Sequence, residues 1–345
     1  MKAQELTHLI FGLPQVEEAE RFLSDFGLDV VHRTASALYL RASAPTPYCY
    51  RIERRAGAGA GAGFIGFGLR VASNADLELL AGLPGASPIR PAEHPGGGNA
   101  VVLTDPSGFV VEAIHGQEEE DAFPHRAPLP LNFGREHTRI NSPQRPPIAP
   151  PEVLKLGHVV LEVADFQATC GWYTRHFGFL PSDVQVLPDG SPAVVFMRLN
   201  LGDTPADHHT LALAQGIRPA FSHAAFEVVD ADAVGMGQRV LRERGWKHAW
   251  GVGRHILGSQ IFDYWNDPMG QKHEHYCDGD LFTEEVPMGV HPVSREAMSQ
   301  WGPIMPRSFT APAITPATVT ALVRHVRRSP DLSLRKLFTL ARLFG

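Results

Sequence analysis

Apolar and polar residues follow one another along this chain in an order that predicts a strand, a helix and further strands, and the same order occurs again in the second half. Residues 6–11 (LTHLIF) form an apolar strand pattern, and the amphipathic stretch VEEAERFLSDFGLDV follows them. Residues 156–161 (LGHVVL) are followed by FQATCGWYTRHFGFLP in the same way. Each helical stretch ends at Phe-Gly-Leu or Phe-Gly-Phe, where glycine suits the end of a helix. The pattern predicts two related strand–helix units.

The match continues further along both halves. An apolar strand followed by an amphipathic helix begins at Gly63 and again at Ser222. Residues 101–112 and 261–274 each contain two alternating runs joined by Asp-Pro-x-Gly, a turn sequence in which proline presets φ and glycine accepts positive φ. We therefore predict an α+β protein of two homologous domains, each built from two strand–helix–strands modules.

The two domains are predicted over residues 5–116 and 152–279. Residues 117–151 are too rich in proline for a helix or a central strand, so we predict a linker that is ordered against the domains. Residues 56–63 alternate glycine and alanine, which is typical of a flexible loop.

Residues 280–345 form an irregular extension that ends in a basic tail. Helical periodicity covers residues 317–328 and 332–344 and is interrupted by Pro330. A helix docked on its own protein or on a second subunit is favoured over one that binds a membrane surface or a partner.

Composition argues against several classes of protein and several kinds of site. A chain of 345 residues with scattered charges and a net charge of −6 is not expected to bind nucleic acid. It has no run of 18 apolar residues and no secretory signal pattern at the amino end, so we expect a cytoplasmic protein without membrane contact. The cysteines lie far apart and lack CxxC spacing, which indicates neither a disulfide framework nor a thiolate zinc site; they are Cys49, Cys170 and Cys277.

Three residues of the second domain fit a metal centre. His158 lies in the first predicted strand of one module, His223 in the first strand of the next, and Glu274 in the last strand after the Asp-Pro-Met-Gly turn. Two imidazoles and one carboxylate leave coordination positions open for an organic substrate and oxygen, which suits Fe(II), although the ligand types alone do not exclude Mn(II). Either histidine taken alone is more often a structural residue.

The repeat favours a metal site over two structural histidines. At the matching places the first domain has His8, Phe64 and Glu112, so it keeps two of the three ligand types and has an aromatic residue in the middle. We therefore predict that only the C-terminal domain holds the metal. Strand alternation points the two histidines that flank Glu274 to the opposite face, so neither His273 nor His275 is assigned to the metal.

From Gly253 onward the chain has Gly-Arg-His at 253–255, then Tyr264, Asp-Pro-Met-Gly at 267–270 and Glu274. In this order and spacing it resembles the signature of the type I extradiol dioxygenases, which are two-domain members of the vicinal oxygen chelate (glyoxalase/bleomycin resistance/dioxygenase) superfamily. One position departs, because Asp263 stands where the family usually has an apolar residue. The resemblance covers roughly residues 5–300, and the tail lies outside it.

The segment DHHTLAL also resembles the family's strand that carries an acid–base histidine. His209 is the better match and His208 the second choice. The resemblance implies that His255 and Tyr264 hydrogen-bond the substrate. A histidine suits proton transfer because its unperturbed pKa lies near neutrality.

The resemblance implies βαβββ modules whose strands form a cupped mixed sheet around a central site. It also implies a homo-oligomeric Fe(II) enzyme that cleaves the ring of a substituted catechol with O2. A glyoxalase-like or epimerase-like metal enzyme without redox chemistry is the main alternative. A binding protein of the bleomycin-resistance kind is another, but it needs no complete metal triad.

Overall fold

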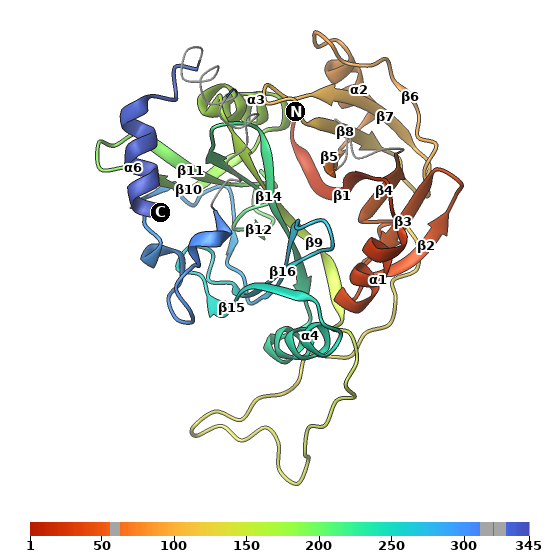
Figure 1. Cartoon of the computed structure of the whole chain (residues 1–345). Coiled ribbons are helices and arrows are strands. Elements are labelled where there is room, and N and C mark those ends of the chain that lie inside the picture. Colours follow the sequence, from red (N-terminus) through yellow and green to blue (C-terminus); the bar gives the residue numbers. More distant parts are fainter. Residues whose placement is uncertain (56–62, 311–319, 321–328, 345) are drawn as a thin grey trace.

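The computed structural model describes residues 1–55, 63–310, 320 and 329–344, and in these ranges the chain forms two large mixed sheets that lie side by side (Figure 1). The N-terminal sheet has the strand order β2-β3-β4-β1-β5-β8-β7-β6, and the C-terminal sheet has the order β15-β16-β17-β14-β9-β13-β11-β10-β19. In each sheet the first strands of two modules pair antiparallel at the centre, as β1 with β5 and β9 with β14.

Each sheet contains two βαβββ modules, so the fold class predicted from the sequence is confirmed. The N-terminal modules are β1 (Ala3–Leu13), α1 (Glu17–Phe26), β2 (Asp29–Arg33), β3 (Ala37–Arg41) and β4 (Tyr50–Arg54), followed by β5 (Gly63–Val71), α2 (Asn74–Ala81), β6 (Arg90–Pro91), β7 (Asn99–Thr104) and β8 (Val110–His115). The C-terminal modules are β9 (Val153–Val163), α3 (Phe166–Phe177), β10 (Leu180–Val186), β11 (Pro192–Arg198) and β13 (Leu211–Gln215), followed by β14 (Ala220–Val228), α4 (Ala231–Glu243), β15 (Lys247–Arg254), β16 (Ile261–Asn266) and β17 (Lys272–Cys277).

Short elements after β17 complete the C-terminal half. Strand β19 (Gly289–Pro292) pairs with β10 at the edge of the sheet, and β18 (Leu281–Phe282) pairs with β12 (Ala206–Asp207). Two 3-10 turns, Glu296–Met298 and Arg307–Phe309, precede α6 (Leu334–Phe344), which stands beside β10 and β11 (Figure 1).

Helix α6 corresponds to the helix predicted over 332–344. The helix predicted over 317–328 and the loop predicted over 56–63 fall outside the described residues, apart from residues 320 and 63. None of the described helices is both long and apolar enough to cross a membrane.

The glycine and turn motifs read from the sequence set where elements end. Helices α1 and α3 end at Gly27 and Gly178, whose φ angles of 106° and 70° are left-handed. In the Asp-Pro-Met-Gly turn, Oδ1 of Asp267 accepts the main-chain N–H groups of Met269 and Gln271 at 2.8 and 2.7 Å. This carboxylate fixes the turn that leads into β17, the strand that carries Glu274.

An aromatic interface joins the two sheets. The two histidines that flank Glu274 lie here: Nε2 of His273 is 3.0 Å from the Tyr50 hydroxyl, and His275 stacks on Phe26 with ring centroids 3.7 Å apart. Both side chains therefore point away from Glu274 and toward the N-terminal half. A single hydrophobic cluster runs through both sheets.

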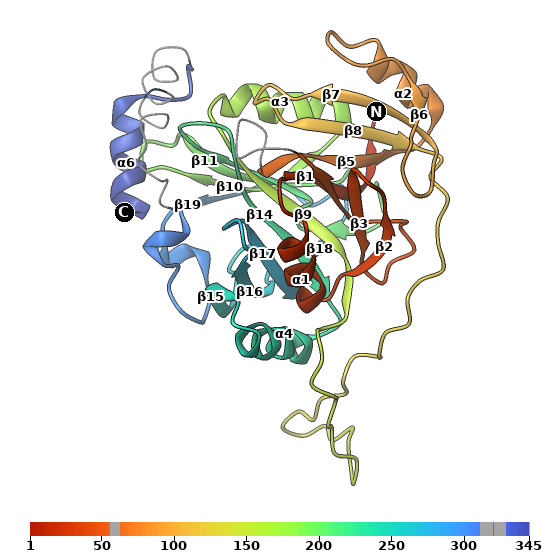
Figure 2. The same ribbon diagram turned by 45° about the vertical axis from the view of Figure 1, so that its right-hand side comes forward.

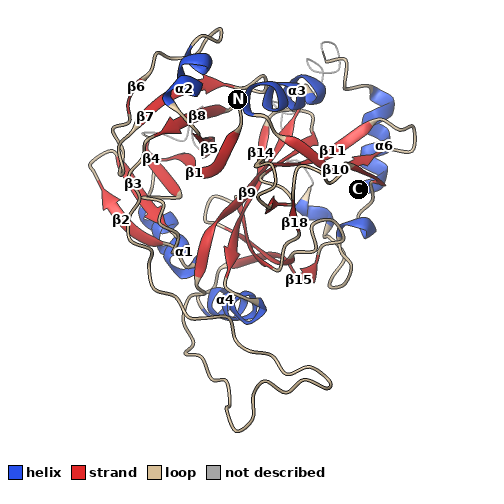
Figure 3. Ribbon diagram, turned by 180° about the vertical axis from the view of Figure 1, so that it is seen from behind, coloured by secondary structure: helices blue, strands red, loops and turns tan. Residues whose placement is uncertain are grey.

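The first residues of the linker lie along the N-terminal sheet, and the rest projects away from the body. Residues 117–123 run along the N-terminal sheet, where main-chain hydrogen bonds join Glu118 to Gly96 and Phe123 to Ser43. The rest projects from the body as a long loop below α4 (Figures 1 and 2), and the same projection is seen from behind in Figure 3. The expectation that the linker is ordered against the domains is therefore wrong for the loop that projects beyond Leu129, whereas Arg126 and Leu129 still bond to Asp230.

Candidate metal centre

Three adjacent strands bring His158, His223 and Glu274 together. In the order β17-β14-β9, Ala225 of β14 lies opposite Glu274 on one side and His158 on the other. His223 precedes Ala225 by two residues, and side chains two residues apart on a strand share a face. One ligand atom from each member of the triad lies within 4.8 Å of the others. The three residues could hold a metal ion.

The Glu274 carboxylate is fully buried, and its charge needs a partner. Its Oε2 lies 3.3 Å from Nε2 of His158 and 3.5 Å from Nε2 of His223, but in the described structure neither oxygen has a hydrogen bond of normal geometry. Burial would raise the pKa of Glu274, yet the nearby His158 and His255 hold this pKa below its usual range. A buried, ionised carboxylate without full hydrogen bonding requires a cation. The donor set and its spacing fit a divalent metal ion.

The N-terminal sheet repeats this geometry with one position changed. Gly68 of β5 lies opposite Glu112 on one side and His8 on the other, as Ala225 does between its two neighbours. Two residues before Gly68 comes Gly66. The residue that takes the place of His223 in the N-terminal sheet is therefore a glycine.

We expected Phe64 at this place, and that prediction is wrong. Phe64 lies two residues nearer the start of β5, where its ring stacks on Phe221 of the C-terminal half at a centroid distance of 4.6 Å. A Cβ atom at Gly66 would overlap with the main-chain oxygen of Val110. The close approach of β5 and β8 leaves no room for a third ligand.

In the N-terminal sheet an arginine supplies the positive charge. Nη2 and Nη1 of Arg51 donate hydrogen bonds to Oε1 and Oε2 of Glu112 at 2.7 and 3.1 Å. The strand position that holds Arg51 in β4 holds Ala212 in β13. Alanine supplies no charge, so the corresponding carboxylate, Glu274, lacks the arginine partner that Glu112 has.

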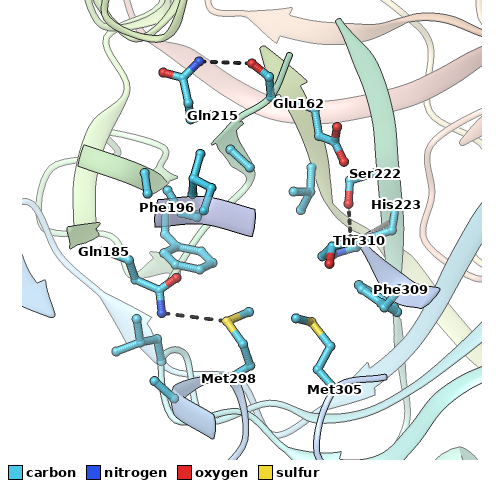
Figure 4. A pocket seen from close by; sticks show the side chains of 18 of the residues that line it. Glu162, Gln185, Phe196, Gln215, Ser222, His223, Met298, Met305, Phe309 and Thr310 are labelled. Atoms are coloured by element: carbon cyan, nitrogen blue, oxygen red, sulfur yellow. Dashed lines mark hydrogen bonds between the residues drawn. The ribbon is translucent and has the colours of Figure 1, made fainter. Parts of the chain in front are cut away.

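A cavity of about 440 Å³ opens beside the triad and includes His158 and His223 in its wall. Figure 4 shows Phe196 and Phe309 on opposite sides of it and Glu162 and Gln215 at one end. Most of the lining is apolar, and α6 contributes Leu337 and Leu340. The cavity can therefore hold a planar apolar ring against the metal ligands.

His255 and Tyr264 line the same cavity and are joined to one another. Nδ1 of His255 lies 2.8 Å from the Met298 carbonyl oxygen, which only accepts, so Nδ1 carries the proton. Nε2 then accepts the hydrogen bond from the Tyr264 hydroxyl, 2.9 Å away. Burial and the nearby Glu274 raise the pKa of Tyr264, which keeps its hydroxyl protonated. The pair presents oriented polar groups beside the triad.

Of the two neighbouring histidines, His209 lines the cavity. A chain of hydrogen bonds orients its ring. The Asp183 carboxylate accepts from Nε2 of His208 at 2.7 Å. In the neutral ring Nδ1 of His208 is then an acceptor, and it lies 3.0 Å from Nδ1 of His209. His209 therefore carries its proton on Nδ1 and keeps a lone pair on Nε2. Burial, together with neighbouring histidines including His158, lowers the pKa of His209, which favours this neutral form.

Asp183 was not found from the sequence. It lies 25 residues before His208, on β10, and its other oxygen accepts a hydrogen bond from Nε2 of His291 at 2.8 Å. Burial raises the pKa of Asp183, but the hydrogen bonds from His208 and His291 outweigh burial and lower it. Nothing in the local pattern of residues 180–186 distinguishes this carboxylate from other polar strand residues.

The departure from the family signature at Asp263 has a local explanation. The side chain is buried on the face of β16 opposite to Tyr264, where it accepts hydrogen bonds from Nε2 of His248 and Nε1 of Trp265, both at 2.7 Å. The carboxylate is satisfied in place and does not enter the cavity.

Residues 155–274 match the family model of the Glyoxalase/Bleomycin resistance protein/Dioxygenase superfamily. The chain carries a domain of this superfamily. The matched stretch contains His158, His223 and Glu274. The resemblance stated from the sequence is confirmed, since the similar proteins include named extradiol dioxygenases.

Two relatives and two solved structures are similar to this chain over more than half of its length. It is 28% identical over 306 residues to Metapyrocatechase 2 of Cupriavidus necator, and the aligned part covers 88% of this chain and 90% of the relative. It is 31% identical over 214 residues to the Iron-dependent extradiol dioxygenase of Rhodococcus jostii (strain RHA1), with 59% and 62% covered. Its fold is similar to the Mn(II)-bound glyoxalase of Novosphingobium aromaticivorans (TM-score 0.72, 22% identity, 91% and 96% covered). It is also similar to homoprotocatechuate 2,3-dioxygenase of Brevibacterium fuscum (TM-score 0.70, 18% identity, 90% and 92% covered).

Proposed function

We propose that this protein is an extradiol dioxygenase that opens the ring of a substituted catechol with O2 at an Fe(II) centre held by His158, His223 and Glu274. The observation that carries the proposal is the buried, unsatisfied Glu274 carboxylate between two imidazoles, next to a largely apolar cavity. The names of both relatives support the reaction, and one of them names iron. In this proposal residues 152–279 form the catalytic domain and residues 5–116 a domain without metal.

Iron at this triad would supply open coordination positions for the two oxygens of a catechol and for O2. The protein's own residues then hold the ring and move protons. The apolar wall, which includes Val160 and Phe196, binds the ring and excludes water. The volume of about 440 Å³ leaves room for a substituent on the catechol ring.

His209 acts as the acid–base residue in this proposal. Its Nε2 lone pair accepts the proton of a substrate hydroxyl, and the same nitrogen later returns it. His255 and Tyr264 hydrogen-bond a substrate oxygen and fix its orientation. His208 and Asp183 act through His209, because they set which of its nitrogens carries the proton.

Protein loaded with ferrous iron without air, and then given oxygen and a panel of substituted catechols, is expected to form a yellow ring-opened product. Visible absorbance measures it. The His8→Ala variant is the control, because His8 belongs to the N-terminal sheet and should keep both iron and rate. Iron bound stoichiometrically without product from any catechol would overturn the proposal in favour of a metal enzyme without redox chemistry. Loading with Mn(II) in parallel tests the identity of the metal.

Changing His209 to glutamine is expected to leave the metal content unchanged and to lower kcat by about 10²- to 10⁴-fold, the usual contribution of general acid–base catalysis. Asp183→Asn should cost about tenfold and shift the pH–rate profile, because an amide can donate to His208 and so allow the wrong tautomer. Steady-state kinetics and metal analysis measure both. A His209 variant with normal kcat would exclude the acid–base assignment.

A further inference from the structure

The projecting part of the linker, residues 124–151, is called the arm here. It leaves the body below α4 and contacts it mainly at its root, where Arg126 forms a bidentate ion pair with Asp230 at 2.6 and 2.7 Å. No residue of 124–150 is buried. An unburied loop of this length in a compact protein is typical of a binding segment or of a disordered one.

The arm has internal structure, which favours binding. Phe133 and Glu136 form a main-chain hydrogen bond, Asn132 bridges to His137, and the Thr138 hydroxyl donates to the Leu131 carbonyl at 2.7 Å. Eight of its 28 residues are proline, which reduces the entropy that is lost on docking. The arm therefore presents its side chains in a preorganised form.

Two stretches of the chain hold most of its exposed large apolar residues. Nine of the fifteen such residues in the described structure lie either in the arm or in segment 280–305, which follows β17 and includes the edge strand β19. Large apolar side chains that these two stretches leave exposed are available for contact with a partner. The nine are Leu131, Phe133, Ile140 and Ile148 in the arm, and Leu281, Met288, Val290, Trp301 and Ile304 in segment 280–305.

The charges of the two stretches are complementary. Apart from Arg126, which is paired with Asp230, the arm has three arginines and one glutamate, a formal charge of +2. Apart from Glu284, which is paired with Lys2, segment 280–305 has three acidic residues and one arginine, a formal charge of −2. No hydrogen bond or ion pair joins the two stretches within the described chain, and no ion pair is formed there by Arg135 or Arg145 of the arm. Each stretch has 26 to 28 residues, which is the size of one side of a standard protein interface.

We propose that the arm of one copy of this chain docks on segment 280–305 of a second copy. Apolar side chains meet at the centre of this contact and arginines meet acidic residues around it, so the contact is both hydrophobic and electrostatic. A second copy is the partner because the complementary surface belongs to this same chain.

The test compares single variants of the full-length protein by sedimentation velocity and light scattering. Wild-type protein is expected to be a dimer or larger assembly that weakens as salt rises. Phe133→Asp in the arm and Val290→Asp in segment 280–305 should each weaken association at least about tenfold, since each places a carboxylate in the contact. Leu79→Asp is the matched control, because Leu79 is 66% exposed on α2 and lies outside both stretches.

Mixing two variants tests whether the arm of one copy binds segment 280–305 of the other. An equimolar mixture of the Phe133→Asp and Val290→Asp proteins should associate again, because each retains the half that the other lacks. The double variant should stay monomeric. A monomeric wild type, an unchanged mass for Phe133→Asp, or a mixture that stays monomeric would each overturn the proposal, and an unchanged mass for Val290→Asp would do so in favour of a contact between arms. Circular dichroism checks folding, and Ile140→Asp with Leu281→Asp is a second pair if either variant unfolds.

Discussion

Glu274→Gln protein is expected to bind no iron and to form no ring-opened product, although it folds. Glutamine keeps the shape of glutamate and can hydrogen-bond the two imidazoles, but it removes the negative charge that the cation needs. We expect activity to fall at least about a thousandfold, since changes in the shell outside the ligands already cost 10- to 100-fold. Metal analysis after gel filtration and the thermal midpoint with and without Fe(II) measure the effect. Wild-type protein should gain about 2.7 kcal/mol at a metal concentration a hundred times the Kd, and Glu274→Gln none.

The matched control for this experiment lies in the same chain. Glu112 occupies the corresponding place in the N-terminal sheet, with Arg51 in place of a metal. Glu112→Gln should therefore leave the metal content at that of the wild type. Equal metal loss in both variants would mean that the charge at Glu274 is not specific to metal binding.

Local patterns predicted most of the fold and the triad. The strand alternation and the Asp-Pro-x-Gly turns predicted strands for His158, His223 and Glu274. The structure shows that these three strands are neighbours and brings the residues together. The middle position of the N-terminal sheet was missed because glycine carries no apolar signal. The register between β1 and β5 also shifts between Ile10 and Phe11, and such an irregularity cannot be read from one sequence.

Local sequence patterns did not predict which side chains bind the site residues. Asp183 and Arg51 lie 25 and 61 residues from the side chains that they bind, and both contacts depend on how strands of one sheet are ordered. The prolines of the arm exclude helix and central strand, but its direction in space is set by the root contact of Arg126 with Asp230, 104 residues away. Patterns of period 2 or 3.6 carry no information on such distant pairs.

Arg51→Met protein should be less stable than the wild type by about 3–5 kcal/mol, the usual cost of breaking a buried ion pair by removing one partner. Arg51 is 4% exposed and Glu112 7% exposed, so water does not replace the lost guanidinium. Burial would raise the pKa of Glu112, but the hydrogen bonds and charges of His8 and of the Arg51 guanidinium hold this pKa well below its usual range. Urea unfolding at neutral pH measures the loss.

The double variant Arg51→Met/Glu112→Gln separates the loss of charge from the loss of packing. Removing the carboxylate as well should recover most of the stability, because no uncompensated charge is left buried. If Arg51→Met were within about 1 kcal/mol of the wild type, the arginine would not be the counterpart of the metal. If both results are as expected, the two sheets solve the same electrostatic problem in two ways. The buried Glu112 carboxylate is then neutralised by a side chain of the protein, and in the proposed function the buried Glu274 carboxylate is neutralised by the metal ion.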